Sequence, residues 1–433
     1  MISDTTPVLA VDEKKLVPVS GHLAQMTDIP PSRMFLINKS LKVFQEKNPG
    51  SPIYDASQGD GGASLPGVPR QILERALELQ IQHGSAYDMP FGTEAYRKSV
   101  IEQYWKLDSA SGWGPANVLA VAGGRDGLVK VYQAMLALGH GRQGDLIMVS
   151  RVPWISYNWG PYGVGANVLW TPGDAAHGWA YSEDAIVESI KFAESKGRKV
   201  AGLVITNPDN PTGLTIPVEK QVTLAKCALD AGVAFVLFDW MYHYVTDESP
   251  MDLNSFLSHF TADERKRIMF LDGITKSLGA SNIRNCHVIA DEAVIKFITA
   301  RASHGVIPSF YSLAVAMAAY EMGFAEAAKT ISEPTNASRG VLKALLLRHE
   351  FQHIIGKGYY AFLHVGDDLE PKGWKDTEPL GQYLAENHGV AVVPGAFFSP
   401  FGGEWIRFSY ATPVERTQGA FKRLVEGLEE LKK

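Results

Sequence analysis

Residues 270–284, FLDGITKSLGASNIR, join two apolar segments through a short polar stretch. The apolar run at 268–271 predicts a buried strand. Lys276 follows in a polar stretch with a glycine on either side, and Arg284 precedes a second apolar run at 287–290. A lysine at the end of a strand can reach a carbonyl group, and a nearby arginine suits a phosphate. Because an exposed loop also explains this stretch, its meaning depends on the rest of the chain.

Short apolar runs alternate with amphipathic segments outward from this stretch. Buried strands are predicted at residues 118–121, 146–149, 168–170, 203–206, 235–239 and 269–272. Helical patterns separate several of them, for example at residues 128–138. This alternation predicts an α/β fold with right-handed crossovers and a mostly parallel central sheet flanked by helices. Ligands of such sheets bind beyond the carboxyl ends of the strands.

The two ends of the chain predict a smaller α+β domain. The N-terminal residues include one helical stretch at 36–44, and the region after an Ala- and Met-rich helix at 312–322 mixes helices with strands at 360–365, 391–393 and 405–410. The predicted division is an N-terminal arm with part of the small domain at 1–54, a large domain at 55–311 and a C-terminal small domain at 312–433.

The composition is that of an ordinary globular protein. The 433 residues are 45% hydrophobic and 20% charged, and the net charge of −6 gives no reason to expect nucleic acid or an anionic membrane surface. Two cysteines, Cys227 and Cys286, are too few for a disulfide framework, so a reducing cytoplasm is expected. We expect no secretory signal, because the first thirty or so residues have no basic region followed by an apolar one. We expect no membrane span, because no apolar run approaches the length of about 20 residues that crosses a bilayer.

Glycines and a tryptophan follow the first two strands of the predicted sheet. Gly123 and Gly124 precede a helical pattern, so backbone N–H groups at the positive end of a helix dipole could hold an anion. A tight turn is the alternative explanation of these glycines. Trp154 follows the strand at 146–149 and offers a flat face for an aromatic ring, although most aromatic residues belong to the core.

Polar residues follow the next strands. The segment at 207–213, NPDNPTG, predicts a rigid turn from which the Asn210 amide would donate a hydrogen bond. Asp239 ends an apolar strand, where a carboxylate is costly unless it is paired. A pyridinium N–H would be a suitable partner for Asp239, and Tyr242 could reach the same ligand. A helix cap is the alternative role of this aspartate.

Together these strand-end groups supply an anion cradle, a stacking face, an amide donor, a buried acid, a lysine and an arginine. A flat aromatic ring that carries a phosphate, with a carbonyl group within reach of the lysine, needs all of these parts. Pyridoxal phosphate (PLP) matches this description.

The motifs resemble those of the PLP-dependent aminotransferases of fold type I, the aspartate and aromatic aminotransferase superfamily of classes I and II. NPDNPTG is close to that family's NPxNPTG motif, and Lys276 with Arg284 follows its lysine-x7-arginine pattern. GGRDGL at 123–128 resembles the family's GGKQAL-type phosphate turn, and PWISY at 153–157 resembles its PYWVSY stretch. The resemblance covers residues 87–407, which is most of the chain.

Three further stretches carry the same resemblance. YDMPFG at 87–92 resembles the segment whose tyrosine reaches the phosphate of the neighbouring subunit, which implies a homodimer. VVPG at 392–395 and RFSYA at 407–411 resemble the region whose arginine grips the α-carboxylate of the substrate.

The resemblance implies a role for each matching residue. Lys276 would form the internal aldimine and then serve as general base and acid, and Asp239 would pair with the pyridinium nitrogen. Asn210 and Tyr242 would bind the 3-oxygen of the ring. The implied catalytic residues are Lys276, Asp239 and Tyr242; the implied cofactor ligands are Gly124, Arg125, Trp154, Asn210, Asp239, Tyr242, Lys276, Arg284 and the partner subunit's Tyr87; Arg407 and Asn210 would bind substrate.

Three positions depart from the family's commonest pattern. Gly273 lies three residues before Lys276, where many relatives have a serine that helps to bind phosphate. Trp240 follows Asp239 where an acidic residue is more usual, and SQGDGGAS at 57–64 departs from the GEPDFxTP motif that is often seen near the substrate. These departures concern the phosphate grip and the substrate pocket.

The expected function is transfer of an amino group between an L-amino acid and a 2-oxo acid in two half-reactions, without a metal. The alternative is another PLP reaction at Cα or Cβ, such as elimination, racemisation, decarboxylation or oxidation. A PLP-sensing regulator would need a DNA-binding domain, and the acidic chain argues against one. Trp240, Tyr359 and Tyr360 are expected to fill the core, with a place at the wall of the substrate pocket as the alternative. His243 is expected to be a structural hydrogen-bonding residue.

Overall fold

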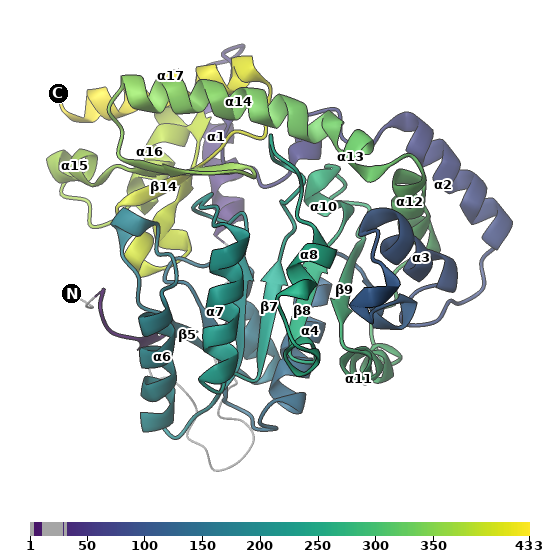
Figure 1. Ribbon diagram of the computed structural model, residues 1–433. Coiled ribbons are helices and arrows are strands. Elements are labelled where there is room, and N and C mark those ends of the chain that lie inside the picture. The colour runs from purple at the N-terminus through teal and green to yellow at the C-terminus, as the bar shows by residue number, and fades with distance from the viewer. Residues whose placement is uncertain (1–3, 11–28, 30–32) are drawn as a thin grey trace.

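The computed structural model describes residues 4–10, 29 and 33–433. The arm predicted at the N-terminus therefore lies partly outside the described residues. Within the described part, helices surround a large sheet and a small sheet (Figure 1). No helix of this part is long and apolar enough to cross a membrane.

The large sheet has eight strands in the order β1-β5-β4-β6-β7-β8-β9-β3. Their bounds are β1 Val8–Leu9, β3 Val118–Val121, β4 Leu146–Val149, β5 Asn167–Trp170, β6 Val200–Thr206, β7 Phe235–Asp239, β8 Ile268–Asp272 and β9 Cys286–Ala290. Strands β5, β4, β6, β7 and β8 run parallel. Their residues are almost all buried, as expected of a sheet that is covered on both faces. The prediction of a mostly parallel sheet is confirmed.

One connection of this sheet carries both Lys276 and Arg284. Strand β9 is antiparallel to both of its neighbours, β8 and β3, because the chain turns back after β8 at the same edge of the sheet instead of crossing over it. The polar segment around Lys276, for which an exposed loop was the alternative explanation, forms a helical turn, α10 (Ile274–Ser277). This turn points Lys276 back over the end of the sheet.

Helices cover the large sheet and the small-sheet region (Figure 1). Their bounds are α1 Met34–Lys47, α2 Arg70–His83, α3 Glu94–Ser99, α4 Gly124–Leu138, α5 Ile155–Trp159, α6 Glu183–Ser195, α7 Val218–Asp230, α8 Leu253–Ser258, α9 Ala262–Arg265, α11 Glu292–Ala302, α12 Phe310–Glu321, α13 Phe324–Ala327, α14 Lys329–Arg348, α15 Gly366–Leu369, α16 Glu378–His388 and α17 Val414–Leu431. Helix α4 begins at Gly124, directly after Gly123 with a φ of 88° that favours glycine. The anion cradle predicted from this turn therefore has the required backbone form.

The small sheet is antiparallel, with the order β10-β11-β14-β13. Its strands are β10 His353–Ile355, β11 Tyr360–His364, β13 Val393–Pro394 and β14 Trp405–Ser409. The strand predicted at 391–393 is split, because β12 (Val390–Ala391) pairs with β2 (Tyr54–Asp55) in a separate two-stranded sheet. In Figure 1 the long helices α14 and α17 cross the top of the molecule above this region. The division of the chain into three domains remains a prediction.

Candidate active site

A cavity of about 680 Å3 opens at the carboxyl ends of the parallel strands. Every site residue named from the sequence lines it except Tyr87, whose side chain is 99% exposed. The lining residues from that set are Gly124, Arg125, Trp154, Asn210, Asp239, Tyr242, Lys276, Arg284 and Arg407. Its volume suits a cofactor together with a small substrate.

Lys276 projects from α10 into this cavity. Its Nζ donates a hydrogen bond to the carbonyl oxygen of Gly59, and the Tyr359 hydroxyl donates to the Lys276 carbonyl at 2.5 Å. Burial lowers the pKa of the lysine amine to about 8, and the nearby Asp60 carboxylate opposes this shift. A buried amine that loses its proton near neutral pH can attack a carbonyl carbon and can also act as a base.

Asp239 ends β7 and is buried at the floor of the cavity. One of its oxygens accepts a hydrogen bond of 2.7 Å from the Tyr157 hydroxyl, and the other accepts from the Met241 N–H at 3.2 Å. Burial raises the pKa of the Asp239 carboxyl to about 6. A cationic N–H beside it would offset the cost of the buried charge and restore the ionised form.

A positive pocket lies at the start of α4. The Arg284 guanidinium donates to the carbonyl oxygens of Ser281 and Ala122, at 2.7 and 3.1 Å. It packs so tightly against Gly123 that a Cβ atom at that position would overlap it. Burial and the neighbouring Arg284 both lower the pKa of Arg125. A bound anion would relieve this repulsion and meet the N–H groups of the helix start, so the pocket suits a phosphate.

Arg407 reaches the cavity from β14 of the small sheet. Its Nη1 donates to the Asn210 side-chain oxygen at 2.9 Å, and its Nη2 donates to the Ser57 carbonyl at 2.8 Å. The Nε atom is buried without a hydrogen-bond partner among the described residues. An incoming carboxylate could accept from this guanidinium. Because the Asn210 oxygen is engaged by Arg407, its amino group is the part of the amide left to donate to a ligand.

A family model described as aminotransferase class I and II matches residues 61–424. The chain belongs to this family. It is a PLP-dependent aminotransferase of fold type I, as the sequence motifs predict. The alternative of another PLP reaction at Cα or Cβ receives no support from the relatives or the solved structures.

Relatives and solved structures agree with this assignment. The aspartate aminotransferase of Bacillus subtilis is 24% identical over 361 residues, which cover 82% of this chain and 87% of that protein. An aspartate aminotransferase of Pyrococcus horikoshii is 23% identical over 404 residues, which cover 92% of this chain and 96% of that protein. The structure of the Thermus thermophilus aspartate aminotransferase with maleate has a TM-score of 0.77 at 21% identity, over 94% of this chain and all of that one.

The cavity of the aminotransferase fits PLP. The positive cradle at Gly123, Gly124 and Arg284 would take the phosphate, and the buried Asp239 would pair with the ring nitrogen. Trp154 lies at the cavity wall, with the Arg125 guanidinium 5.6 Å from its ring centroid, and would cover the ring.

Two tyrosines of the aminotransferase site were given no site role from the sequence: Tyr157, and Tyr360, for which the pocket was only the alternative to the core. Tyr157 holds the Asp239 carboxylate, and no pattern marks it beyond its place in the PWISY stretch. Tyr360 was expected to fill the core, and it is buried, yet it also lines the cavity. Its hydroxyl oxygen lies 3.1 Å from that of Tyr242, and its ring centroid lies 4.2 Å from the Arg407 guanidinium. The core prediction for Tyr360 is therefore incomplete.

The glycine-rich segment at 57–64 passes closely over the tyrosines. A Cβ atom on Gly59 would lie 2.9 Å from the Tyr360 hydroxyl, and one on Gly61 would lie 2.5 Å from the Tyr359 hydroxyl. Asp60 in this segment accepts a hydrogen bond of 3.0 Å from the Ser281 hydroxyl. The glycines of this segment depart from the family's motif, and they allow this close approach of the backbone to the tyrosines.

Trp240, His243 and Gly273 lie behind the cavity. The Trp240 indole N–H donates to the Gln221 side chain at 2.9 Å in the core. The His243 Nε2 lies 2.6 Å from the Asp272 carboxylate, as expected of a structural histidine. At Gly273 a Cβ atom would lie 2.5 Å from the Cys286 Cα on β9, so the strand leaves no room for the serine that many relatives have there.

Proposed function

We propose that the protein transfers the amino group of an L-amino acid to a 2-oxo acid, with PLP anchored on Lys276. The observation that carries this proposal is the convergence of Lys276, Asp239 and Arg407 on one cavity from three different parts of the chain. Bound PLP supplies an electron sink that stabilises negative charge at the substrate Cα. The cytoplasm is the proposed location, since Cys227 and Cys286 are free thiols.

Lys276 is the proposed base and acid. With a pKa of about 8, its amine can remove the proton from the substrate Cα near neutral pH and return it elsewhere. Two hydrogen bonds hold Lys276 over the cavity floor: its Nζ donates to the Gly59 carbonyl, and its carbonyl accepts from the Tyr359 hydroxyl. Its position therefore depends on the glycine-rich segment as well as on α10.

Asp239 and Arg407 are the proposed orienting residues. Asp239, held by Tyr157, would keep the ring nitrogen protonated, and Arg407 would bind the substrate α-carboxylate in two-pronged fashion. Because Arg407 is already braced by Asn210 and Ser57, little side-chain freedom is lost when a carboxylate binds.

The test is a panel of amino donors, beginning with aspartate because the relatives carry that name. Release of a 2-oxo acid that requires an added 2-oxo acid acceptor would support the proposal. Lys276→Ala should abolish this turnover and the absorbance of lysine-bound PLP. Oxo-acid release that continues without an acceptor would argue for elimination or oxidation instead, and a fully active Lys276→Ala variant would refute the assignment.

We also propose a homodimer in which the partner subunit's Tyr87 completes each phosphate site. The side chains of Tyr87 and the nearby Met89 are 99% and 59% exposed, although Asp88 between them is fixed to His83 at 2.8 Å. Such an ordered, exposed apolar segment suits an interface between copies.

Mixing two inactive variants tests this arrangement. Lys276→Ala subunits and Tyr87→Ala subunits, dissociated and reassembled together, form hybrid dimers in which one site has both native residues. We expect about a quarter of the wild-type activity to return, because half of the dimers are hybrids and each has one complete site. Mixtures that stay inactive would contradict the proposal that the two subunits share each site.

A further inference from the structure

Asp272 ends β8, directly before the turn that carries Lys276, and its side chain is fully buried. One of its carboxylate oxygens accepts a hydrogen bond of 2.6 Å from the Gly273 N–H. The other accepts from the Tyr104 hydroxyl at 2.5 Å and from the His243 Nε2 at 2.6 Å. With three donors directed at its two oxygens, this carboxylate is favoured in its charged form.

The two histidines beside Asp272 do not balance this charge. The Met251 N–H donates to the His243 Nδ1 at 3.0 Å, so that nitrogen carries no proton, and the ring is neutral with its one proton on Nε2. The Trp105 indole N–H donates to the His287 Nε2 at 2.8 Å. Burial lowers the pKa of His287 to about 4, although the Asp272 charge opposes this shift. Both imidazole rings are therefore held neutral.

Weak acids on neighbouring elements also feel the Asp272 charge. Burial raises the pKa of each of these acids, and the Asp272 charge raises it further, so all of them stay protonated at neutral pH. They are Tyr96 on α3, Tyr104, Tyr244, Cys286 on β9 and Tyr320 on α12. Among the described residues, no lysine or arginine forms an ion pair with Asp272. A buried charge without a cationic partner next to a ligand cavity indicates a functional role.

Asp272 and Asp239 lie at the ends of adjacent strands. Asp239 pairs in register with Leu271, the residue before Asp272. Because successive side chains of a strand point to opposite faces, Asp239 and Leu271 face one side of the sheet and Asp272 faces the other. The Asp272 charge still acts on Asp239: burial is the main cause that raises the pKa of the Asp239 carboxyl, and the Asp272 charge adds to it.

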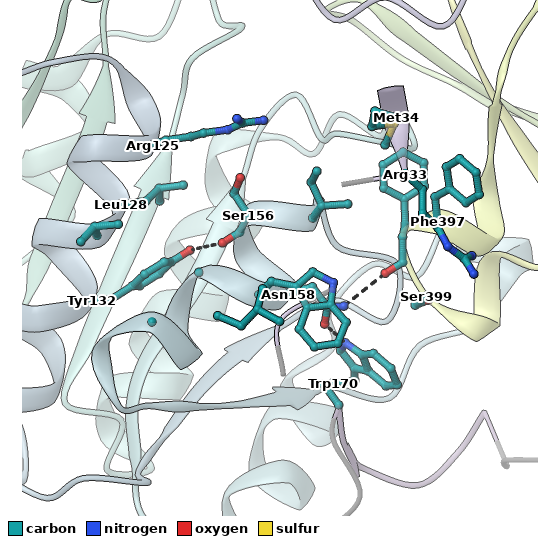
Figure 2. Close-up of a pocket in the computed structure, with 18 of the residues that line it drawn as sticks. Arg33, Met34, Arg125, Leu128, Tyr132, Ser156, Asn158, Trp170, Phe397 and Ser399 are labelled. Carbon is teal, nitrogen blue, oxygen red and sulfur yellow. Dashed lines mark hydrogen bonds between the residues drawn. The ribbon is translucent and has the colours of Figure 1, made fainter. Parts of the chain in front are cut away.

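Other titratable groups face Asp239 from α4, α5 and α10. Tyr157 on α5 donates a hydrogen bond to it, and the Lys276 amine opposes the effect of burial on the Asp239 pKa. On α4, burial raises the pKa of Tyr132, and the Asp239 charge adds to this effect. Figure 2 shows the Tyr132 hydroxyl bonded to the Ser156 carbonyl. None of these groups is negatively charged at neutral pH.

We propose that Asp272 is a positioning residue of the reaction, whose buried charge holds the proton between Asp239 and the ring nitrogen when PLP is bound. Asp272 does not line the cavity, so it acts through Asp239. The inference rests on the proposed pairing of Asp239 with the ring nitrogen. Loss of the proton from that pair would leave two neighbouring carboxylates unbalanced, and their repulsion opposes this loss. Asp239 therefore keeps the ring nitrogen protonated to a higher pH than it could alone.

Pyridoxamine phosphate tests this role in the cofactor-free protein. It has an amine in place of the PLP carbonyl and cannot form a covalent bond with Lys276. Its affinity should fall as the pH drops through the Asp239 pKa of about 6, because a protonated Asp239 cannot pair with the ring N–H. Asp272→Asn removes the neighbouring negative charge and so lowers that pKa. We expect the acid limb of the affinity profile to move down by about 0.5 to 1 pH unit.

Two control variants separate the charge of Asp272 from the packing around it. His243→Gln alters the same hydrogen-bond network but keeps the Asp272 charge and an N–H donor, so the acid limb should stay within about 0.2 pH units of wild type. Asp263→Asn removes an exposed carboxylate on α9 that pairs with Lys266 at 2.7 Å. This variant has the same change of net charge and should leave the acid limb unchanged.

The wild-type protein offers a second test that does not depend on the folding of Asp272→Asn. Nitrogen-15 NMR of labelled histidine, with His243→Gln to assign the signals, reports the protons on the His243 ring. We expect one protonated and one unprotonated nitrogen at neutral pH. A doubly protonated His243 would cancel the Asp272 charge and overturn the inference.

Two results of the pyridoxamine phosphate titration would also overturn it. One is an acid limb that does not move in Asp272→Asn, and the other is an equal movement in His243→Gln. If the limb moves only in Asp272→Asn but no donor is transaminated, the proposed function fails and the action of Asp272 on Asp239 stands.

Discussion

The Tyr157 hydroxyl lies 2.7 Å from a carboxylate oxygen of Asp239 and ties α5 to the end of β7. This hydrogen bond lowers the pKa of Asp239 against the larger effect of burial, which raises it to about 6. The ionised form of Asp239 at neutral pH thus depends in part on a residue from a neighbouring helix.

Tyr157→Phe should weaken cofactor binding most at low pH. Loss of the hydrogen bond raises the pKa of Asp239 further, so the carboxylate that would pair with the ring nitrogen is lost at a higher pH than in the wild type. We expect PLP affinity to fall by about ten-fold near pH 7, with the acid limb of its pH profile shifted upward. Tyr181→Phe, which removes a buried hydroxyl bonded to the Val204 carbonyl, is the control. An unshifted acid limb would contradict this role.

Lys276→Met should stabilise the cofactor-free protein at neutral pH. Below pH 8 the amine holds its proton although burial disfavours the charged form. Between pH 8 and the ordinary value of 10.5, the folded chain loses this proton before the unfolded chain does, so wild-type stability rises with pH across that window. The gain from the variant, at most on the order of 3 kcal/mol, should therefore shrink between pH 8 and 10.5.

Urea denaturation at pH 7 and pH 10 measures this gain. Lys296→Met removes an exposed lysine from α11 and should change stability little at either pH. An equal effect of Lys276→Met at both values would show that the proton on Lys276 is not the cause.

Arg407→Lys should impair substrate binding while PLP binding is retained. A lysine ammonium cannot make both the Asn210 contact and a two-pronged contact with a carboxylate. We expect KM for amino donors to rise by at least about ten-fold with an unchanged absorbance of bound PLP. Arg416→Lys, at an exposed arginine that bonds the Ile53 carbonyl, should leave KM unchanged. A normal KM in Arg407→Lys would remove this residue from the substrate site.

Gly273→Ser should lower stability and should not strengthen the phosphate grip. Its Cβ would lie 2.5 Å from the Cys286 Cα, so β8 or β9 has to shift, at a cost of about 1–3 kcal/mol. Gly340→Ala, in the interior of α14 with open space around it, should instead stabilise by up to about 1 kcal/mol. Tighter PLP binding in a stable Gly273→Ser variant would show that the strands can accommodate the serine.

The sequence predicted β3, β4 and β7 to the residue, because each is a short apolar run with a clear end: a glycine turn follows β3, Ser150 and Arg151 follow β4, and Asp239 ends β7. It could not predict that β9 is antiparallel, since side-chain patterns carry no strand direction. The strand expected at 391–393 was split because Ala391 and Val393 pair with different sheets, which depends on contacts far away in the chain.

For the site, strand ends predicted that Lys276 and Asp239 would meet, and the resemblance to the family implied Arg407; all three line one cavity. Tyr157 was missed, and Tyr360 was expected in the core, with the pocket only as the alternative. A tyrosine in a mostly apolar segment has the same pattern whether its hydroxyl faces a cavity or a core. Only the packing of α5 and β11 decides whether each hydroxyl faces the cavity or the core.

Asp239 on β7 pairs in register with Leu271 on β8, and the Trp240 N–H continues this ladder to the Leu271 carbonyl at 3.1 Å. The acid of the site and the turn that carries Lys276 are thus attached to adjacent, fully buried strands. Such a ladder opens only when the large sheet itself unfolds. The amide protons of β7 and β8 should therefore be among the last in the chain to exchange with deuterated solvent, with or without PLP.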